Sequence, residues 1–202
     1  KWLKADESEY IPYFKKTAAA AMMVLIKNSL RKIGIEFDVF SSERELVESG
    51  QVKDTLDYMQ SKDLLYTGTL PKPLGESDED WVPTEQLLFK STQFGDDSDR
   101  VIARANGETT YFASDIAYHL NKFKRGFQKQ IDVWGADHGG YVKRIKSALG
   151  AVTNNQADLD VVLCQIVNLE KDGKPFKMSK RAGNFVMIED VLGEIDADVL
   201  RL

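Results

Sequence analysis

Apolar residues recur at helical spacing over the first long stretch of the chain. Residues 10–33 include four consecutive alanines and few helix-breaking residues, and Gly34 follows where a C-terminal capping glycine is expected. Residues 36–40 alternate between polar and apolar types, which predicts a strand. A second helix is predicted over 41–62, because a serine and, three residues later, a glutamate are spaced as in a capping box.

Short runs rich in β-branched and aromatic residues alternate with further helical patterns in the rest of the chain. Strands are predicted over 64–66, 87–89, 101–104, 109–112, 131–134 and 161–167, and helices over 115–124 and 140–149. Asn106-Gly107 is a strong hairpin signal. This order predicts an α/β fold, a Rossmann-like parallel sheet with flanking helices and a β-hairpin insertion. Residues 71–83 are predicted to form an exposed acidic loop.

Composition narrows the class of protein. The chain has 202 residues, 43% of them apolar and 29% charged, and no apolar run approaches the roughly 20 residues of a membrane-spanning helix. The single Cys164 lies in an apolar run and is expected to be a buried structural thiol, which excludes a disulfide framework and favours a cytosolic location. A net charge of −5 argues against a broad basic surface for nucleic acid, so any RNA contact needs a local patch or a larger protein.

Both ends of the sequence suggest a piece of a longer protein. The chain begins at Lys1 without a methionine, and it stops at Leu202 one turn into an apolar-periodic segment. We therefore expect residues 1–202 to be part of one larger domain.

A loop rich in glycine and lysine follows the last predicted strand. Residues 172–184 can wrap a polyphosphate with backbone amides and mobile ammonium groups. Lys177 and Lys180 are point charges able to stabilise negative charge as it moves from an α-phosphate onto leaving pyrophosphate. The alternative is a solvated basic loop without a ligand.

Tyr111 and Asp115 are the second candidate pair. If Tyr111 ends a strand and Asp115 opens the next helix, both can face one pocket, and a carboxylate beside a phenol suits a guanidinium. Alternatively, Asp115 caps its helix and Tyr111 packs in the core. The residues alone do not favour either interpretation.

Two further segments contain clustered polar residues. Asp137 and His138 follow a predicted strand and could contact a ribose, an amino group or a guanidinium. A metal site is not expected there, because the chain's other histidine, His119, is distant in sequence and no ligand cluster forms. Asp96 and Asp97, after a glycine, suggest a turn with solvated carboxylates, and no chemistry is assigned to them.

These segments together resemble one enzyme family. Residues 177–181, Lys-Met-Ser-Lys-Arg, resemble the KMSKS signature of class I aminoacyl-tRNA synthetases, and the continuation through Phe185 and Val186 is similar to arginyl-tRNA synthetases. Residues 110–119 resemble that family's Tyr-x-x-x-Asp-Ile pattern, and 91–97 its Ser-Thr-x-Phe-Gly-Asp-Asp. Residues 135–141 resemble its Gly-Ala-Asp-His-His-Gly-Tyr, with Gly139 in place of the second histidine. The resemblance spans about residues 17–202.

The resemblance implies ATP-dependent activation of arginine and its transfer to tRNA(Arg) in the cytoplasm, with Mg²⁺ expected alongside ATP and no metal held by the protein. It implies no membrane association. The implied catalytic residues are Lys177 and Lys180. The implied ATP-binding residues are Lys177, Met178, Ser179, Lys180, Asp137 and His138, and the implied arginine-binding residues are Tyr111, Asp115 and His138.

The family also needs an upstream His-x-Gly-His signature and a tRNA-reading helical domain, and neither is found in these 202 residues. We therefore expect this chain to carry roughly the second half of a catalytic domain and to be inactive alone. Two alternatives remain open. One is a nucleotidyltransferase of related fold that lacks a guanidinium pocket, and the other is a non-catalytic synthetase-like binding module.

Overall fold

A computed structural model describes residues 2, 5–72, 82–168, 170–171, 173–175 and 186–201. The chain forms two compact units, Lys1–Phe40 with Asn168–Leu202, and Ser41–Val167. That all 202 residues belong to one catalytic domain stays a prediction. Among the described residues, no helix is both long and apolar enough to cross a membrane.

The first unit is built on one long helix, α1 (Glu7–Lys32). The Asp6 carboxylate accepts a hydrogen bond from the Ser8 amide at 2.9 Å and caps its start. Gly34, with φ +67°, ends it: the amides of Gly34 and Ile35 donate to the carbonyls of Arg31 and Leu30 at 2.9 and 3.0 Å. This is a Schellman motif, so the capping glycine predicted from the sequence is confirmed.

The rest of the first unit consists of short elements near the C-terminus. They are β6 (Glu170–Lys171), β7 (Lys174–Pro175), α6 (Ile188–Leu192) and α7 (Ala197–Leu200), with β6 and β7 paired antiparallel. Glu189 of α6 accepts hydrogen bonds from Ser29 and Lys32 of α1, and Arg201 donates to the Gly34 carbonyl at 3.3 Å. Polar contacts therefore join the two ends of the sequence within this unit.

The second unit begins with two helices and an antiparallel sheet. The helices are α2 (Glu43–Glu48) and α3 (Gln51–Ser61), and the sheet has the order β1 (Leu65–Gly68), β2 (Gln86–Phe89), β3 (Arg100–Ala103). A 3₁₀ helix, η2 (Ser91–Phe94), lies between β2 and β3. The three strands at 64–66, 87–89 and 101–104 are thus confirmed.

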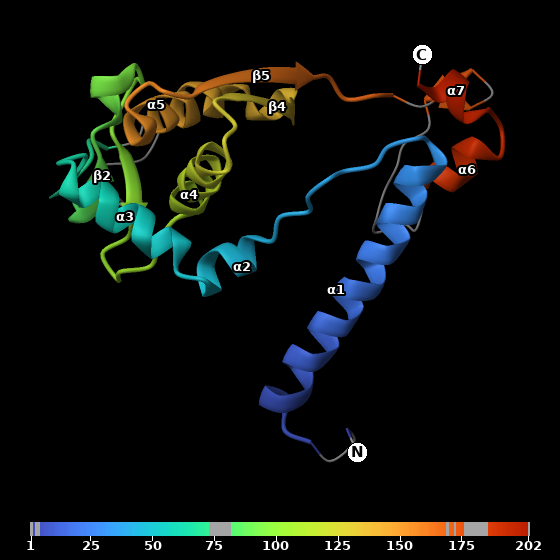
Figure 1. The fold of residues 1–202 in the computed structure, drawn as a ribbon, viewed down its shortest axis with the longest axis horizontal. Coiled ribbons are helices and arrows are strands. Elements are labelled where there is room, and N and C mark those ends of the chain that lie inside the picture. The colour runs from blue at the N-terminus through green and yellow to red at the C-terminus, as the bar shows by residue number, and fades with distance from the viewer. Residues whose placement is uncertain are drawn as a thin grey trace. The chain divides into compact units, whose positions relative to one another are not determined.

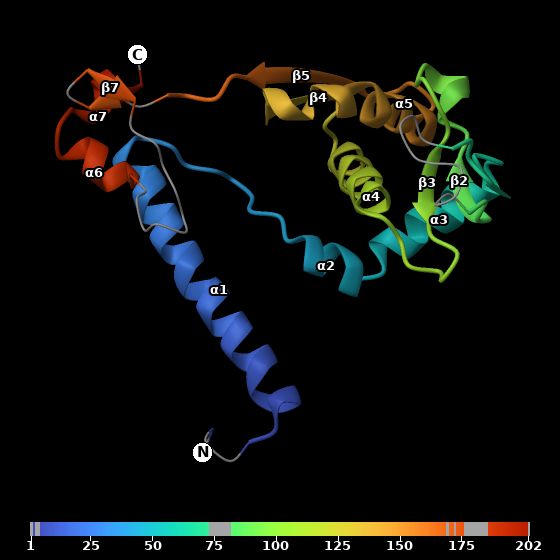
Figure 2. The same ribbon diagram turned by 180° about the vertical axis from the view of Figure 1, so that it is seen from behind.

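A parallel crossover completes the second unit. Helix α4 (Tyr111–Lys124) leads into β4 (Lys129–Gly135), which continues through η3 (Ala136–Tyr141) and α5 (Val142–Thr153) to β5 (Asp158–Cys164). Strands β4 and β5 pair parallel, from Lys129↔Asp158 to Gly135↔Cys164, and both ribbon views show them side by side (Figures 1 and 2). The α/β fold with a parallel sheet, flanking helices and a hairpin region is confirmed.

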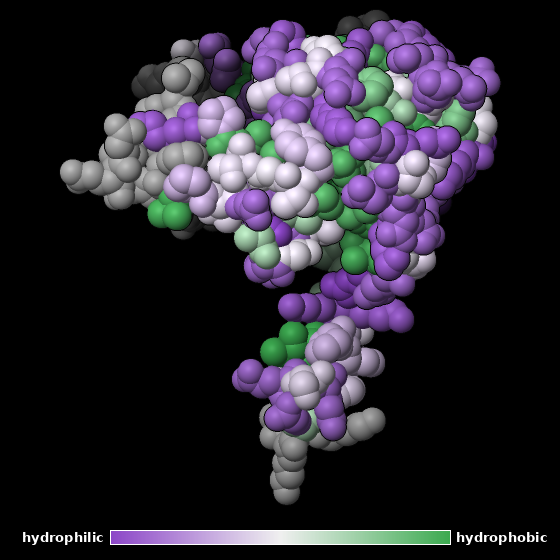
Figure 3. Space-filling view, turned by 90° about the vertical axis from the view of Figure 1, so that its left-hand side faces the viewer, coloured by the Kyte–Doolittle hydropathy of each residue, from purple (hydrophilic) through white to green (hydrophobic). Residues whose placement is uncertain are grey.

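The hydrophobic core of the second unit lies between the helices and the two sheets. Its fully buried side chains come from α3, β2, β3, α4, α5 and β5, among them Met59, Phe89, Ile102, Ile116, Ile145 and Leu159. Outside the core, the face of the molecule in Figure 3 is largely hydrophilic, with smaller hydrophobic areas between the polar side chains. Burial of the apolar side chains supplies the main driving force for folding this unit.

In the first third of the chain one predicted strand is wrong and one predicted helix is interrupted. Residues 36–40 form no strand, because no described segment pairs with them; the Phe37 and Phe40 rings pack together instead, and Lys27 lies 4.4 Å from the Phe40 ring centroid. The helix predicted over 41–62 is broken at Gly50, whose φ of +81° interrupts the helical backbone. Only half of the expected capping box forms, with the Glu45 amide donating to Ser42 Oγ at 3.3 Å.

In the middle of the chain one predicted strand is corrected, one predicted turn is confirmed and one predicted loop is left open. Residues 109–112 form one bridge, Ala103↔Thr109, and then enter α4, because the Thr110 amide and hydroxyl donate to β3 carbonyls and turn the backbone. The Asn106-Gly107 turn is present, with Gly107 at φ +83° and its amide donating to the Arg104 carbonyl. Most of the acidic loop predicted over 71–83 lies outside the described residues.

The strand predicted over 161–167 is shifted and is not buried. It spans Asp158–Cys164, and Cys164 is exposed rather than buried. The reason is that, within the described chain, the β4–β5 sheet has two strands and only one covered face. On the other face Ile131, Val133 and Val162 expose 62%, 67% and 49% of their surface.

Replacing Gly50 by alanine should lower the free energy of unfolding by about 1 kcal/mol, since an L-residue is strained at positive φ. No atom lies within 4 Å of the position a Cβ would take, so the cost is backbone strain alone. Urea unfolding of the two variants checks this. Gly140→Ala is the matched control, because Gly140 also has open space but no positive φ. Equal losses in the two variants would contradict the argument.

Candidate functional site

Tyr111 and Asp115 lie on the first two turns of α4. Thr110 precedes the helix and ties it to β3, because its amide donates to the Ile102 carbonyl at 2.8 Å and its hydroxyl donates to the Val101 carbonyl at 2.9 Å. Residues four apart lie on the same face of a helix. The structure therefore places Tyr111 and Asp115 on one side of α4, although no hydrogen bond joins these two described side chains.

The alternative interpretation of this pair is wrong on both counts. Thr110, not Asp115, occupies the N-cap position of α4, and the Tyr111 side chain is not in the core, since the residue is 81% exposed. The functional interpretation assumed that Tyr111 ends a strand. In the structure Tyr111 is instead the first residue of α4. Tyr111 lines a surface cavity of about 590 Å³ whose other polar lining residues are Glu43, Arg104, Glu108, Thr109, Thr110 and Ser114.

Tyr141 is a residue that the sequence motifs did not single out. It ends η3, directly after β4, and its hydroxyl donates to Asp115 Oδ2 at 2.6 Å. Burial, and then the hydrogen bond to Asp115, raise the pKa of the Tyr141 phenol well above its usual range, so it stays a donor at neutral pH. The signal was available, because Tyr141 closes the Gly-Ala-Asp-His-Gly-Gly-Tyr segment.

Aromatic packing holds the Tyr141 ring in place. Its centroid lies 6.0 Å from that of Phe112 in an edge-on arrangement and 5.8 Å from that of Trp134, and the Arg144 guanidinium lies 5.0 Å from it. Such contacts add to the area that the ring buries. The Asp115 carboxylate is thus fixed by a donor that is itself fixed.

A buried histidine, His119, lies on α4 one turn after Asp115. His119 is 4% exposed; its Nδ1 lies 2.8 Å from the Asp115 carbonyl oxygen and its Nε2 lies 2.8 Å from Asp132 Oδ2. Lys122 Nζ lies 2.9 Å from the other Asp132 oxygen. Burial opposes ionisation of Asp132, but the hydrogen bonds from His119 and Lys122 outweigh it and hold its pKa below the usual value.

Asp137 and His138 lie where the sequence predicted, directly after β4. Both side chains are mostly exposed, at 74% and 63%, and His138 Nε2 lies 3.7 Å from Asp137 Oδ2. The His138 ring also packs edge-on against the Trp134 ring, with 6.3 Å between the ring centroids. At Gly139, a Cβ would meet the Leu163 side chain at 3.4 Å, an ordinary contact. Asp137 and His138 are therefore accessible to a ligand.

The lysine loop cannot be placed beside these residues. Lys177, Met178, Ser179, Lys180 and Arg181 lie outside the described residues. Their predicted role at the ATP phosphates stays a prediction. Among the described residues, no group of three or more histidine, cysteine and acidic side chains could hold a metal ion.

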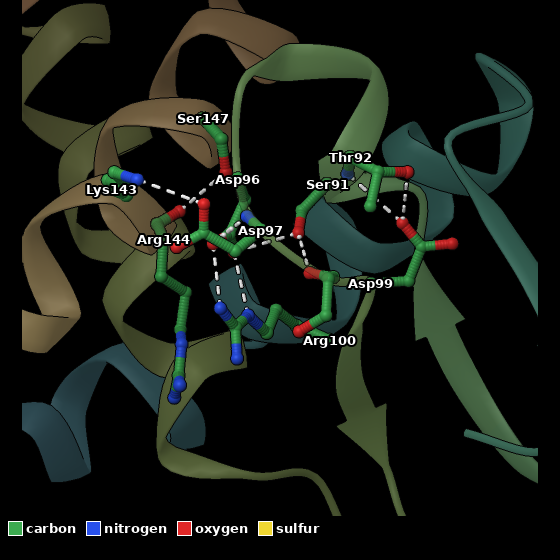
Figure 4. Close-up of polar contacts among 10 residues, drawn as sticks. Ser91, Thr92, Asp96, Asp97, Asp99, Arg100, Lys143, Arg144 and Ser147 are labelled. Atoms are coloured by element: carbon green, nitrogen blue, oxygen red, sulfur yellow. Dashed lines mark hydrogen bonds and ion pairs between the residues drawn. The ribbon is translucent and has the colours of Figure 1, made fainter. Parts of the chain in front are cut away.

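Asp96, which the sequence suggested was solvated, is instead the centre of a buried network (Figure 4). Arg100 contacts both of its carboxylate oxygens at 2.7 Å, Ser91 Oγ donates at 2.9 Å and the Asp97 amide at 2.7 Å. Burial raises the energy of the Asp96 charge, but these donors outweigh it and lower its pKa. The network joins η2 to β3 and forms part of the scaffold under α5.

The neighbouring carboxylates have different surroundings. Asp97 is exposed and pairs with Lys143 of α5 at 2.9 Å, whereas Asp99 accepts from Thr92 and from the Tyr66 hydroxyl. Arg144 extends beside Arg100 in Figure 4, and burial, then the nearby Arg100 charge, lower its pKa. The segment after β2 is thus held together by ionic contacts that motif matching alone did not reveal.

Sequence comparison finds close relatives over the whole chain. The chain is 49% identical over 201 residues to an arginine–tRNA ligase from Rhodospirillum rubrum, and 51% identical over 195 residues to one from Ruegeria pomeroyi. These matches cover 100% and 96% of this chain and 34% of each relative. The chain is homologous to part of the arginine–tRNA ligases. It spans about a third of the length of these relatives.

Structural comparison agrees with the arginine–tRNA ligase match. A crystal structure described as an arginyl-tRNA synthetase from Campylobacter jejuni superposes with a TM-score of 0.76 at 38% identity, covering 96% of this chain and 38% of that one. No family model matches the sequence. The family predicted from the short motifs is therefore confirmed, while the roles of individual residues stay predictions.

Replacing Asp96 by asparagine should lower the free energy of unfolding by about 3 kcal/mol, because one partner of a buried, hydrogen-bonded ion pair is removed. Because the folded pKa of Asp96 is depressed, its contribution is complete above the unfolded pKa of about 4 and is lost as the pH falls below it. Urea unfolding at several pH values measures both effects. Asp97→Asn is the adjacent control and should stay near the wild-type stability, since Asp97 is exposed. A loss as large for Asp97→Asn would refute the assignment.

Proposed function

We propose that the protein containing this chain is an arginine–tRNA ligase that activates arginine with ATP and transfers it to tRNA(Arg). The observation that carries the proposal is the match to such ligases over the whole chain at about half identity. The geometry around Asp115 supports it, because a fixed, partly buried carboxylate suits a guanidinium.

Asp115 is the residue we assign to the substrate guanidinium. Tyr141 donates to its Oδ2 atom, and no other described side chain donates to this carboxylate, so Oδ1 can accept from an arginine side chain. Tyr111, on the same helix face, and His138, beyond β4, would bound the substrate. A site that satisfies fixed donors rejects ligands that lack them, so lysine and citrulline bind poorly.

ATP is the second substrate. We assign Asp137 and His138 to the nucleotide because both are exposed at the end of β4, where ligands bind in open α/β sheets. Lys177, Met178, Ser179 and Lys180 would contact the phosphates, with Mg²⁺ arriving on ATP. Lys177 and Lys180 stabilise the charge that develops on the phosphates.

The reaction has two steps. The arginine carboxylate oxygen attacks the α-phosphorus of ATP, the bond to pyrophosphate breaks, and arginyl-adenylate forms. A hydroxyl of the 3′-terminal adenosine of tRNA(Arg) then attacks the arginyl carbonyl and releases AMP. We place this activity in the cytoplasm, where tRNA is used for protein synthesis.

Replacing Asp115 by asparagine in the full-length enzyme should raise the KM for arginine by at least about tenfold and leave the KM for ATP unchanged, since a charge-assisted hydrogen bond to the guanidinium is lost. Arginine-dependent pyrophosphate exchange measures both constants. Asp137→Asn should show the opposite pattern, with the KM for ATP raised. If Asp115→Asn shifts both constants equally, Asp115 does not select the guanidinium.

Tyr141→Phe should raise the KM for arginine several-fold, on the order of the loss of one hydrogen bond. The ring keeps its packing against Phe112 and Trp134, so stability should fall less than it does on replacing Tyr141 by alanine. Thermal unfolding and exchange kinetics of the two variants separate packing from hydrogen bonding. A normal KM for arginine in Tyr141→Phe would show that the phenol does not orient Asp115.

A further inference from the structure

His119 is a buried titratable residue to which the proposed reaction assigns no role. Its side chain is 5% exposed, and it lies on α4 four residues after Asp115. The ring sits edge-on to Tyr118 and faces β4, where the carboxamide nitrogen of Gln130 also donates to the His119 backbone carbonyl at 3.1 Å. Tyr118 thus packs against the ring, and β4 binds the backbone of the same residue.

Both ring nitrogens of His119 face oxygen atoms that can only accept. Nδ1 lies 2.8 Å from the backbone carbonyl of Asp115, and a carbonyl has no proton to donate. Nε2 lies 2.8 Å from Asp132 Oδ2. A neutral imidazole carries one N–H, so one of these contacts would set two lone pairs against each other.

The Asp132 carboxylate is ionised in this setting. Lys122 Nζ lies 2.9 Å from its second oxygen, and the hydrogen bonds it accepts outweigh its burial and hold its pKa below the usual value. An ionised Asp132 offers no proton to Nε2. Among the described residues, the charged groups around the ring are Asp132 from β4 and, through it, Lys122 from α4.

We propose that His119 is held as an imidazolium that donates to both Asp132 and the Asp115 carbonyl, and that it is a positioning residue for the Asp115 carboxylate. This inference rests on the proposed function for its link to arginine. The ring fastens the second turn of α4 to β4, and Tyr141 fastens the Asp115 side chain from η3. Backbone and carboxylate of the same residue are thereby fixed from two elements.

The charge on His119 does not oppose the substrate. The negative charge of Asp132 lies against the imidazolium and offsets its positive charge. The ring contacts the backbone of Asp115 rather than its carboxylate. A close charge pair in a partly buried site is screened little by salt. Loss of one ring proton would remove one of the two hydrogen bonds, either the one to the Asp115 carbonyl or the one to Asp132.

Nitrogen NMR of ¹⁵N-histidine-labelled full-length enzyme tests the charge directly. At pH 7.5 both ring nitrogens of His119 should resonate as protonated nitrogens, with the signals assigned by their loss in His119→Gln. One unprotonated ring nitrogen at that pH would overturn the proposal. The result does not depend on whether arginine is the substrate.

Kinetics test the positioning role. His119→Phe should raise the KM for arginine by about tenfold with the KM for ATP unchanged, and His119→Gln, which keeps one donor, should raise it less. Equal changes in the two constants, or no change in a folded variant, would contradict positioning. If His119→Phe does not fold, Asp132→Asn serves instead, because it should return His119 to the neutral ring and raise the KM for arginine.

The two proposals fail in different ways. If Asp115→Asn leaves the KM for arginine unchanged, the assignment of Asp115 to the guanidinium is wrong, whatever the state of His119. If Asp115→Asn behaves as expected while the His119 spectrum shows a neutral ring, only the inference about His119 is wrong.

Discussion

The hydrogen bond from Tyr141 to Asp115 is the contact on which the geometry of the candidate site depends. It joins η3 to the second turn of α4, at the end of the segment that the His119–Asp132 and Lys122–Asp132 contacts already tie to α4 through β4. Without it, a partly buried carboxylate would lack a donor, which is costly in a region of low polarity. The aromatic packing around Tyr141 and the parallel crossover behind it can be understood as supports for this one contact.

The sequence predicts a helix or strand correctly where a local pattern of residues decides the structure. The long first helix with its Gly34 cap and the strand β4 follow from periodicity and capping chemistry. Residues 36–40 and 109–112 were misread because a strand exists only where a partner pairs with it, and pairing is a long-range property. The exposure of Cys164 could not be foreseen for the same reason, since an apolar run does not reveal which face of its sheet is covered.

The candidate site shows the same division between local patterns and long-range contacts. Tyr111 and Asp115 were found because their spacing is a sequence property, whereas the Tyr141 partner of Asp115 lies 26 positions away and required the fold. Asp96 and Asp97 look alike in the sequence, yet one is buried against Arg100 and the other is solvated. Both carboxylates pair with a cation, so the fold separates them by how deeply it buries each pair.

The register of β4 against β5 limits how this part of the chain can evolve. The Lys129 ammonium group lies 2.7 Å from Asp158 and 2.6 Å from Asp160 at the exposed start of the parallel pair, in the register that buries Gln130 and Leu159 on one face. A one-residue slip of β4 would turn Gln130 to the open face of the sheet, and a slip of β5 would do the same to Leu159. Insertions or deletions between Lys129 and Tyr141 are therefore poorly tolerated, whereas the turn at Asn106-Gly107 can change length at little cost. Insertions and deletions among natural relatives should therefore accumulate in that turn and be rare in β4.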